Sequence, residues 1–362
     1  MITLVNYKMK KSILELAWNV PESEYRAGSG VSYSMLATFE REGAKAIPTI
    51  GAPKSSAALR FGSIVDTLLT DEAEFENKFL VADISKTSET IIGIVNKIFE
   101  ATEGATNDLA SIPLETMMIY INDANYQSNW KDETRANAVV RDGKDYFALL
   151  ALAGDKTIIT QMEYNDGLAC VEALKTHPYV SKYFTDPFFV TDEIESHYQL
   201  KFKYCDNTID VRCMYDRLQV NHTQKTIQPL DLKTTGKDEE EFEHSFLAWS
   251  YWIQSSMYSQ ILRWVCDMDD YFKDFTILPF KFVVINRYNR TPMTWVDNNN
   301  LVIGERIDNH GTKHKHWLQL YNEFKWHVAN EKYNYSYDTY MNDGLRTLEN
   351  IKVYDSGITE VL

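Results

Sequence analysis

Two aspartates and a lysine, Asp216, Asp231 and Lys233, have the types and spacing that could do chemistry. If the segments that carry them fold back on each other as a symmetric hairpin, Asp216 lies opposite Asp231, and Lys233 projects from the same face. Two facing carboxylates repel each other unless a cation or a proton offsets their charge. Clustered oxygen ligands suit Mg²⁺ or Mn²⁺, and an adjacent lysine suits a hydrolytic water or a phosphate oxygen.

The elements that must position these residues are two short strands. Residues 211–220 and 227–234 are rich in apolar and β-branched side chains, and the polar run NHTQKT between them predicts the loop of a β-hairpin. Leu230 and Leu232 then point to the opposite, core-facing side of the second strand. The hairpin prediction therefore carries the site prediction.

Helical and strand patterns surround this hairpin. Helices are expected over 31–42, 57–69 and 242–266, with a last one near 304–330, and strands over 188–221 and 276–288. Gly62 lies inside the helix 57–69, which indicates close packing there, and Asp66 follows one turn later. This order predicts an α+β protein with an α/β core, in which a central mixed sheet with an antiparallel meander is flanked by helices.

Composition limits the classes of function. The chain has 362 residues, 44% of them hydrophobic and 25% charged, which is ordinary for a globular protein. Its 52 acidic and 37 basic residues give a net charge of −15, so any contact with nucleic acid must come from a local basic lining or from metal ions.

Cysteine use and hydropathy indicate the compartment. The four cysteines form no CxxC pair, which argues against a zinc ribbon and a disulfide framework. The longest charge-free run, 245–262, contains five serines and two glutamines and is too polar to span a membrane. We therefore expect a soluble protein in the cytoplasm.

The ordered set of residues resembles the PD-(D/E)XK nuclease superfamily, and more closely its RecE/RecB-like and lambda-exonuclease-like phage recombination nucleases. The set consists of Asp216, then Asp231-Leu-Lys233, then Gln254-x-x-x-Tyr258 on the following helix. The upstream segments VSYSMLATF and FGSIVDTLLTDEAEFENKFLV are similar to the family's early helices. The similarity covers roughly residues 31–80 and 155–265.

The resemblance implies a restriction-endonuclease-like fold and roles for these residues. Asp216 and Asp231 would bind Mg²⁺ or Mn²⁺, with the backbone carbonyl of Leu232 as a further ligand, and Lys233 would orient the attacking water. Gln254 and Tyr258 would hold the DNA strand or a water beside the metal.

One position departs from the family pattern. Relatives often place a metal-binding histidine four residues after the helix glycine, where this chain has Asp66. A carboxylate there can still bind Mg²⁺, which prefers hard oxygen donors, but its shorter reach could leave the site with one metal. Glu195, just before the first meander strand, is a further acidic candidate.

Basic residues near the hairpin are candidates for contacts with DNA phosphates. They are Arg212, Arg217, Lys225 and Lys237. The alternative for these residues is ordinary solvated surface, and for Lys233 it is a structural ion pair with Asp231.

The function that the resemblance implies is a metal-dependent exonuclease that hydrolyses phosphodiester bonds at duplex DNA ends in phage-type recombination, together with a single-strand annealing protein. Ring-shaped homo-oligomers are the expected assembly. The alternatives are a catalytically weak DNA-binding scaffold of the same fold and a structure-specific endonuclease. We expect one nuclease domain over 1–362, with a family-like core at 31–80 and 155–290, a helical insertion at 83–150 and a C-terminal tail at 330–362.

Overall fold

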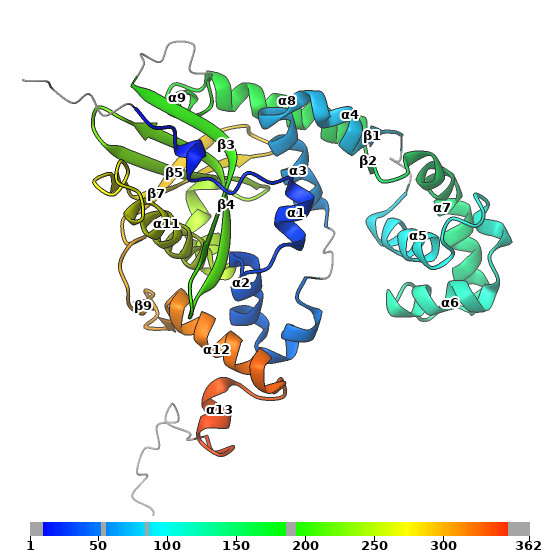
Figure 1. Cartoon of the computed structure of the whole chain (residues 1–362). Helices are drawn as coiled ribbons and strands as arrows, with labels where there is room; N and C mark the ends of the chain where they lie inside the picture. Colours follow the sequence, from blue (N-terminus) through cyan, green and yellow to red (C-terminus); the bar gives the residue numbers. More distant parts are fainter. Residues whose placement is uncertain (1–9, 52–55, 84–86, 186–192, 347–362) are drawn as a thin grey trace, which may run out of the picture.

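Helices surround a central sheet (Figure 1). The computed structural model describes residues 10–51, 56–83, 87–185 and 193–346. Its helices are α1 (Glu22–Ala27), α2 (Tyr33–Glu42), α3 (Ala57–Thr70), α4 (Phe75–Lys78), α5 (Glu89–Ala101), α6 (Leu114–Asp123), α7 (Asp132–Ala153), α8 (Gln161–Thr176), α9 (Ser181–Phe184), α10 (Phe242–Ala248), α11 (Tyr251–Asp267), α12 (Trp317–Asn330) and α13 (Tyr337–Met341).

A six-stranded mixed sheet forms the centre of the molecule, with its strands in the order β3-β4-β5-β7-β8 and β6 beside β5. β3, β4 and β5 are antiparallel, β5 and β7 are parallel, and β7 and β8 are antiparallel again. The predicted α+β class is therefore confirmed. The strands of this sheet are β3 (Ile194–Cys205), β4 (Asp210–Asn221), β5 (Thr226–Thr235), β6 (Thr276–Ile277), β7 (Phe280–Asn286) and β8 (Pro292–Asp297).

The predicted hairpin and the two N-terminal helices are present. β4 and β5 enclose both predicted strands, and α2 and α3 match the helices expected at 31–42 and 57–69 within two residues. Ser56 caps α3 by accepting a hydrogen bond from the backbone N–H of Leu59. A Cβ atom on Gly62 would lie 3.4 Å from Thr234 Oγ1 of β5, so this glycine marks the close approach of α3 to the sheet.

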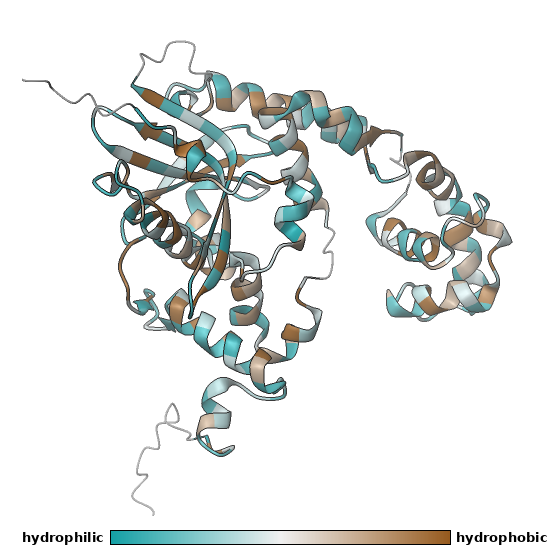
Figure 2. Ribbon diagram, viewed as in Figure 1, coloured by the Kyte–Doolittle hydropathy of each residue, from teal (hydrophilic) through white to brown (hydrophobic). Residues whose placement is uncertain are grey.

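Each face of the sheet is buried under helices. Side chains of α2, α11 and α12 share one apolar core with β3, β4 and β7, and α3, α8 and α9 cover the other face over β5 and β7. The helices are apolar toward these cores and polar on their outer sides (Figure 2). α8 approaches α3 so closely that a Cβ on Gly167 would lie 2.6 Å from Ile64.

The single long helix expected over 242–266 is wrong. The segment forms α10 and α11, because Ser250 between them has a left-handed backbone with φ of 59° and is buried. The carbonyl of Trp249, at the end of α10, accepts hydrogen bonds from the Tyr33 hydroxyl (2.9 Å) and the Arg41 guanidinium (3.2 Å). These long-range bonds fix a corner that local sequence patterns do not reveal.

Two further boundaries differ from the expectations. The strand at 276–288 is divided into β6 and β7, with Pro279 between them, because proline cannot donate a hydrogen bond to the sheet. The helix near 304–330 begins only at Trp317, because the preceding residues form the short strands β9 (Arg306–Ile307) and β10 (Lys313–His314). Residues 347–362 of the predicted tail lie outside the described residues.

α5, α6 and α7 pack around an apolar core of their own, which lies to one side of the sheet (Figure 1). A Cβ on Gly143 of α7 would lie 2.7 Å from Val95 of α5, so these two helices cross at close range. This unit joins the remainder through β1 (Phe79–Val81) and β2 (Thr157–Ile159), which pair in parallel.

Within the described ranges, no helix has the length and apolar character needed to cross a bilayer.

Candidate functional site

The acidic site forms where the β4–β5 ladder ends. Paired residues run from Asn221 and Thr226 at the turn to Arg217 and Leu230, and beyond Leu230 strand β5 continues its pairing with β7 only. Asp216 and Asp231 are next in register but are not a ladder pair, which corrects the predicted regular hairpin at this point. The backbone N–H of Leu232 instead donates a 2.7 Å hydrogen bond to the Asp216 carboxylate.

This gap in the ladder also changes which side chains face the core. Tyr215 and Leu218 both belong to the core beneath α11, although alternation along a regular strand would place them on opposite faces. On the neighbouring strand β3, Gln199 lies between the residues that pair with Tyr215 and Arg217, and its backbone is left-handed with φ of 50°. A non-glycine residue held in this conformation is typical of functional sites. Asp216 therefore lies where both strands are irregular and can meet groups from either face.

Asp231 and Lys233 project toward α11. Asp231 is 3% exposed, and one of its carboxylate oxygens forms an ion pair with the Lys233 ammonium. Its other oxygen accepts a 2.5 Å hydrogen bond from the Gln254 side chain on α11. Lys233 also lies 4.7 Å from the centre of the Tyr251 ring, at the first residue of α11. Gln254 is therefore placed beside Asp231, and its role toward DNA or a metal-bound water stays a prediction.

Asp66 reaches the site from α3, on the other face of the sheet. Its carboxylate accepts a 2.7 Å hydrogen bond from the Gln199 side chain, which also contacts Thr70. Asp66 is therefore held beside β3 and within electrostatic range of Asp216 and Asp231.

Burial and neighbouring acids raise the pKa of two carboxylates of the site, Asp216 and Asp66. Burial raises the pKa of Asp216 well above its ordinary value, and the charges of Asp231 and Asp66 raise it further. Burial also raises the pKa of Asp66 to about 6, helped by the charges of Glu22 and Asp231, although the Gln199 hydrogen bond opposes the shift. Lys233 faces Asp231 and Asp216, and Lys78 partly offsets the charge of Asp66. The acids still outnumber these lysines, and the excess of negative charge favours the binding of a cation or a proton.

Lys233 remains protonated in this setting. Burial alone would lower the pKa of its amine, but the charge of Asp231, helped by Tyr251 and Asp216, raises the pKa above its ordinary value. A permanently charged ammonium can hold a phosphate oxygen or position a water. It cannot accept a proton as a general base near neutral pH.

Tyr258 lies in the core next to the site. It is 7% exposed, and its ring packs against those of Tyr215 (5.3 Å between centres) and Tyr33 (6.4 Å). Its backbone carbonyl accepts a hydrogen bond from the Tyr215 hydroxyl. These contacts give Tyr258 a packing role beside Asp216 and Asp231, and a direct contact with DNA stays a prediction.

Glu195 lies in a different cluster. Its carboxylate accepts hydrogen bonds from Ser12 (2.5 Å) and from the backbone N–H of Ile13 (3.1 Å), and it bonds the rings of His197 (2.7 Å) and His222 (2.9 Å). It therefore joins the N-terminal segment to β3 and β4 rather than extending the acidic site.

Two of the predicted DNA-binding residues are engaged elsewhere. Arg212 is 9% exposed and donates to the carbonyls of Gly28 and Arg26 at the end of α1. Arg217 is 3% exposed, donates to the Tyr183 carbonyl at 3.0 Å and lies against the Tyr198 ring. Both arginines thus join elements of the fold.

The two lysines lie at opposite ends of β5. Lys225 is in the turn between β4 and β5, at the end remote from the acids. Lys237 is exposed and follows β5 at the same end as Lys233. Of the four basic residues, only Lys237 is therefore placed to contact a phosphate near the acids.

Sequence reasoning missed Gln199, Tyr33 and Tyr251. Gln199 binds Asp66, and the two tyrosines adjoin Lys233 and Trp249. Tyr251 lies three residues before Gln254, one helical turn away, and this spacing could have identified it.

The oxygen atoms at the site are of the kind that bind a hard cation, but they are not arranged as a complete set of ligands. Over the described ranges, no group of three or more His, Cys, Asp or Glu side chains is arranged to hold a metal ion. The carboxylates of Asp216 and Asp231 nevertheless supply oxygen donors, and Gln254 Oε1 is buried and has no hydrogen-bond partner within the described chain. The Leu232 carbonyl also faces the gap, because N–H and C=O of one strand residue point the same way.

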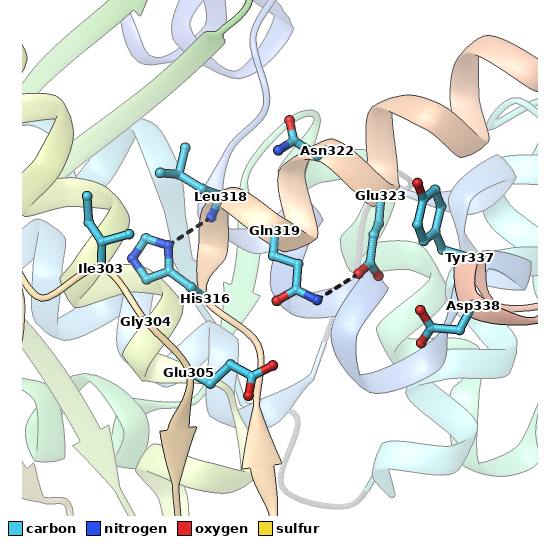
Figure 3. A pocket seen from close by; sticks show the side chains of 10 residues that line it. All are labelled: Ile303, Gly304, Glu305, His316, Leu318, Gln319, Asn322, Glu323, Tyr337 and Asp338. Atoms are coloured by element: carbon cyan, nitrogen blue, oxygen red, sulfur yellow. Dashed lines mark hydrogen bonds between the residues drawn. The ribbon is translucent and has the colours of Figure 1, made fainter. Parts of the chain in front are cut away.

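A well-formed cavity lies apart from this site. It measures about 470 Å³ and lies between α12, α13 and the loop before β9 (Figure 3). Its lining includes Glu305, Glu323 and Asp338, and none of the predicted site residues lines it. His316 faces it, and its Nδ1 accepts a hydrogen bond from the Leu318 N–H as the cap of α12. The chemistry of the chain therefore points to the acids rather than to this cavity.

Comparison with other proteins adds no family assignment. The chain matches no protein-family model and no curated protein sequence.

Proposed function

We propose that the chain is a metal-dependent deoxyribonuclease that hydrolyses phosphodiester bonds at duplex DNA ends. The observation that carries the proposal is the meeting of Asp216, Asp231 and Asp66 with one lysine at the gap between β4 and β5. Carboxylates are concentrated there without enough positive charge to neutralise them. Sites that bind divalent ions for phosphate chemistry have this composition.

Each residue has a role in the proposed reaction. Asp216 and Asp231 would hold Mg²⁺ or Mn²⁺, with Asp66 and the Leu232 carbonyl as further oxygen donors. When bound, the ion would polarise the scissile phosphate and lower the pKa of a water. The Lys233 ammonium would position that water and offset charge that develops on the phosphate. Gln254 would keep Asp231 oriented through its 2.5 Å hydrogen bond.

Digestion of linear duplex DNA tests the proposal. Wild-type protein with Mg²⁺ is expected to degrade linear duplex and to spare covalently closed circular duplex, and EDTA is expected to stop the reaction. Lys233→Ala is expected to abolish digestion. Lys273→Ala, which removes an exposed lysine paired with Asp270, is the matched control and is expected to digest normally. Digestion of the closed circle would indicate a structure-specific endonuclease.

A non-catalytic DNA-binding scaffold is the second candidate. The ion pair between Lys233 and Asp231, and the absence of three convergent metal ligands among the described residues, favour it. DNA binding by wild-type protein without digestion in Mg²⁺ or Mn²⁺ would decide for the scaffold. Recombination with a single-strand annealing protein, and assembly into a ring, are further parts of the proposal.

A further inference from the structure

Trp249 is a large aromatic side chain that the fold leaves in solvent. It is 54% exposed, although it ends α10 directly before the buried Ser250. Its backbone is held from two sides, since the carbonyl accepts hydrogen bonds from the Tyr33 hydroxyl and the Arg41 guanidinium. The corner is therefore rigid while the indole ring remains free to receive a partner.

A continuous set of contacts leads from this corner to the acidic site. The Tyr33 ring lies 6.4 Å from the Tyr251 ring, and the Tyr251 ring lies 4.7 Å from the Lys233 ammonium. Lys233 is paired with Asp231. Trp249 is thus placed beside the site at which phosphate chemistry is proposed, and α11 fixes both features, because its first turns carry Tyr251 and Gln254.

Arg41 gives the corner a positive charge. Its guanidinium lies 5.4 Å from the centre of the Trp249 ring, and the residue is exposed at the end of α2. Among the described carboxylates none forms an ion pair with it. In a chain of net charge −15, a surface arginine without an acidic partner is notable, and it lies against the exposed tryptophan.

From this arrangement we infer that Trp249 and Arg41 form a binding site for single-stranded DNA, in which a base stacks on the indole and the guanidinium contacts the adjacent phosphate. Flat aromatic side chains beside positive charges bind single strands in this way, largely without regard to base identity. The inference rests on the proposed function, because it assigns the strand that leaves or enters the acidic site to this corner.

Binding without cleavage tests the inference. Full-length protein is titrated, in EDTA, into a fluorescein-labelled single strand that carries 2-aminopurine near one end or the other. Trp249→Ala is expected to weaken binding about 5- to 100-fold and to remove the quenching of 2-aminopurine. Trp249→Phe is expected to keep part of both effects. Arg41→Ala is expected to weaken binding and to reduce its dependence on salt.

Trp130→Ala is the matched control, because Trp130 is 46% exposed and lies in the separate helical unit. Equal affinity of Trp249→Ala, Trp130→Ala and wild type would overturn the inference and would point to a protein partner for this corner. The two proposals fail separately. If wild type digests nothing in Mg²⁺ but Trp249→Ala still loses single-strand binding, the nuclease proposal fails and this one stands. If digestion is present and Trp249→Ala binds normally, the reverse holds.

Discussion

Two partly buried carboxylates, Glu195 on β3 and Asp216 on β4, differ in their neighbours. Glu195 is surrounded by hydrogen-bond donors, and although burial opposes ionisation, the donors from His197, Ser12 and Ile13 lower its pKa to about 2. Asp216 has one backbone donor, from Leu232, and two other acids nearby, so its pKa is raised. A carboxylate that accepts several hydrogen bonds is structural, whereas acids that the fold leaves in excess suit the proposed cation site.

Replacing Asp216 gives the largest expected effect. Asp216→Asn is expected to reduce digestion of linear duplex by at least about 100-fold, because a charged ligand is lost. The free energy of unfolding is expected to stay equal or to rise, since repulsion with Asp231 and Asp66 is relieved and the amide oxygen still accepts the Leu232 N–H. Initial digestion rates and urea unfolding measure the two effects. Near-normal digestion by this variant would remove Asp216 from the reaction.

Replacing Glu195 is expected to affect stability rather than digestion. Glu195→Gln is expected to lower the free energy of unfolding by roughly 2–3 kcal/mol, because several buried donors lose a charged acceptor. Digestion per folded molecule is expected to be unchanged. Glu172→Gln on the exposed side of α8 is the control and is expected to change stability by less than about 0.5 kcal/mol. Loss of digestion in folded Glu195→Gln would place Glu195 at the active site after all.

Low pH is expected to remove the contribution of Glu195 to the free energy of unfolding. Its folded pKa of about 2 is below the ordinary value of 4.5, so its contribution to stability is complete above about pH 4.5 and is lost as the pH falls toward 2. His222, whose pKa burial lowers, changes stability in the same direction from near 6.5 downward. The stability gap between wild type and Glu195→Gln is therefore expected to narrow by about 2 kcal/mol between pH 5 and pH 2, as followed by urea unfolding. A constant gap would contradict the assignment.

The smallest expected effect is stabilisation by metal. At about ten times its dissociation constant, Mg²⁺ is expected to stabilise the wild-type protein by roughly 1 kcal/mol, which a thermal melt detects as a higher midpoint. Asp216→Asn should show no such shift, and Glu195→Gln should show the full shift. An equal response of all three proteins would mean that Mg²⁺ binds elsewhere.

Much of the fold around the acidic site could be predicted from the sequence. The alternation of apolar residues around a polar turn placed β4 and β5, and the spacing of Asp216, Asp231 and Lys233 placed all three residues at one end of the hairpin. The helix that carries Gln254 was expected as well, although its break at Ser250 was not. The hydrophobic pattern of a single segment was enough to predict a residue's position when that position depended on one helix or one hairpin.

The remainder depends on contacts between distant parts of the chain. In the sequence, Arg212 and Arg217 look like surface arginines of a strand. Only the packing of α1 and α9 against the sheet shows that both guanidinium groups donate hydrogen bonds to backbone carbonyls. The same reason hid the role of Gln199, whose left-handed backbone and bond to Asp66 arise from the meeting of β3 with α3. The position of Glu195 just before the first meander strand makes it a candidate ligand, whereas its hydrogen-bond donors Ser12 and His222 lie far from it in the sequence.

The short pairing of β1 with β2 has a consequence for how the chain is built. The backbone leaves the sheet-bearing portion after Val81 and returns at Thr157, and these points are nearly adjacent because Phe79 is in register with Thr157 and Val81 with Ile159. Closing so small a gap with a brief linker requires little loop entropy. Deletion of the three-helix portion, which has an apolar core of its own, is therefore expected to leave the acids, Lys233 and Trp249 in place.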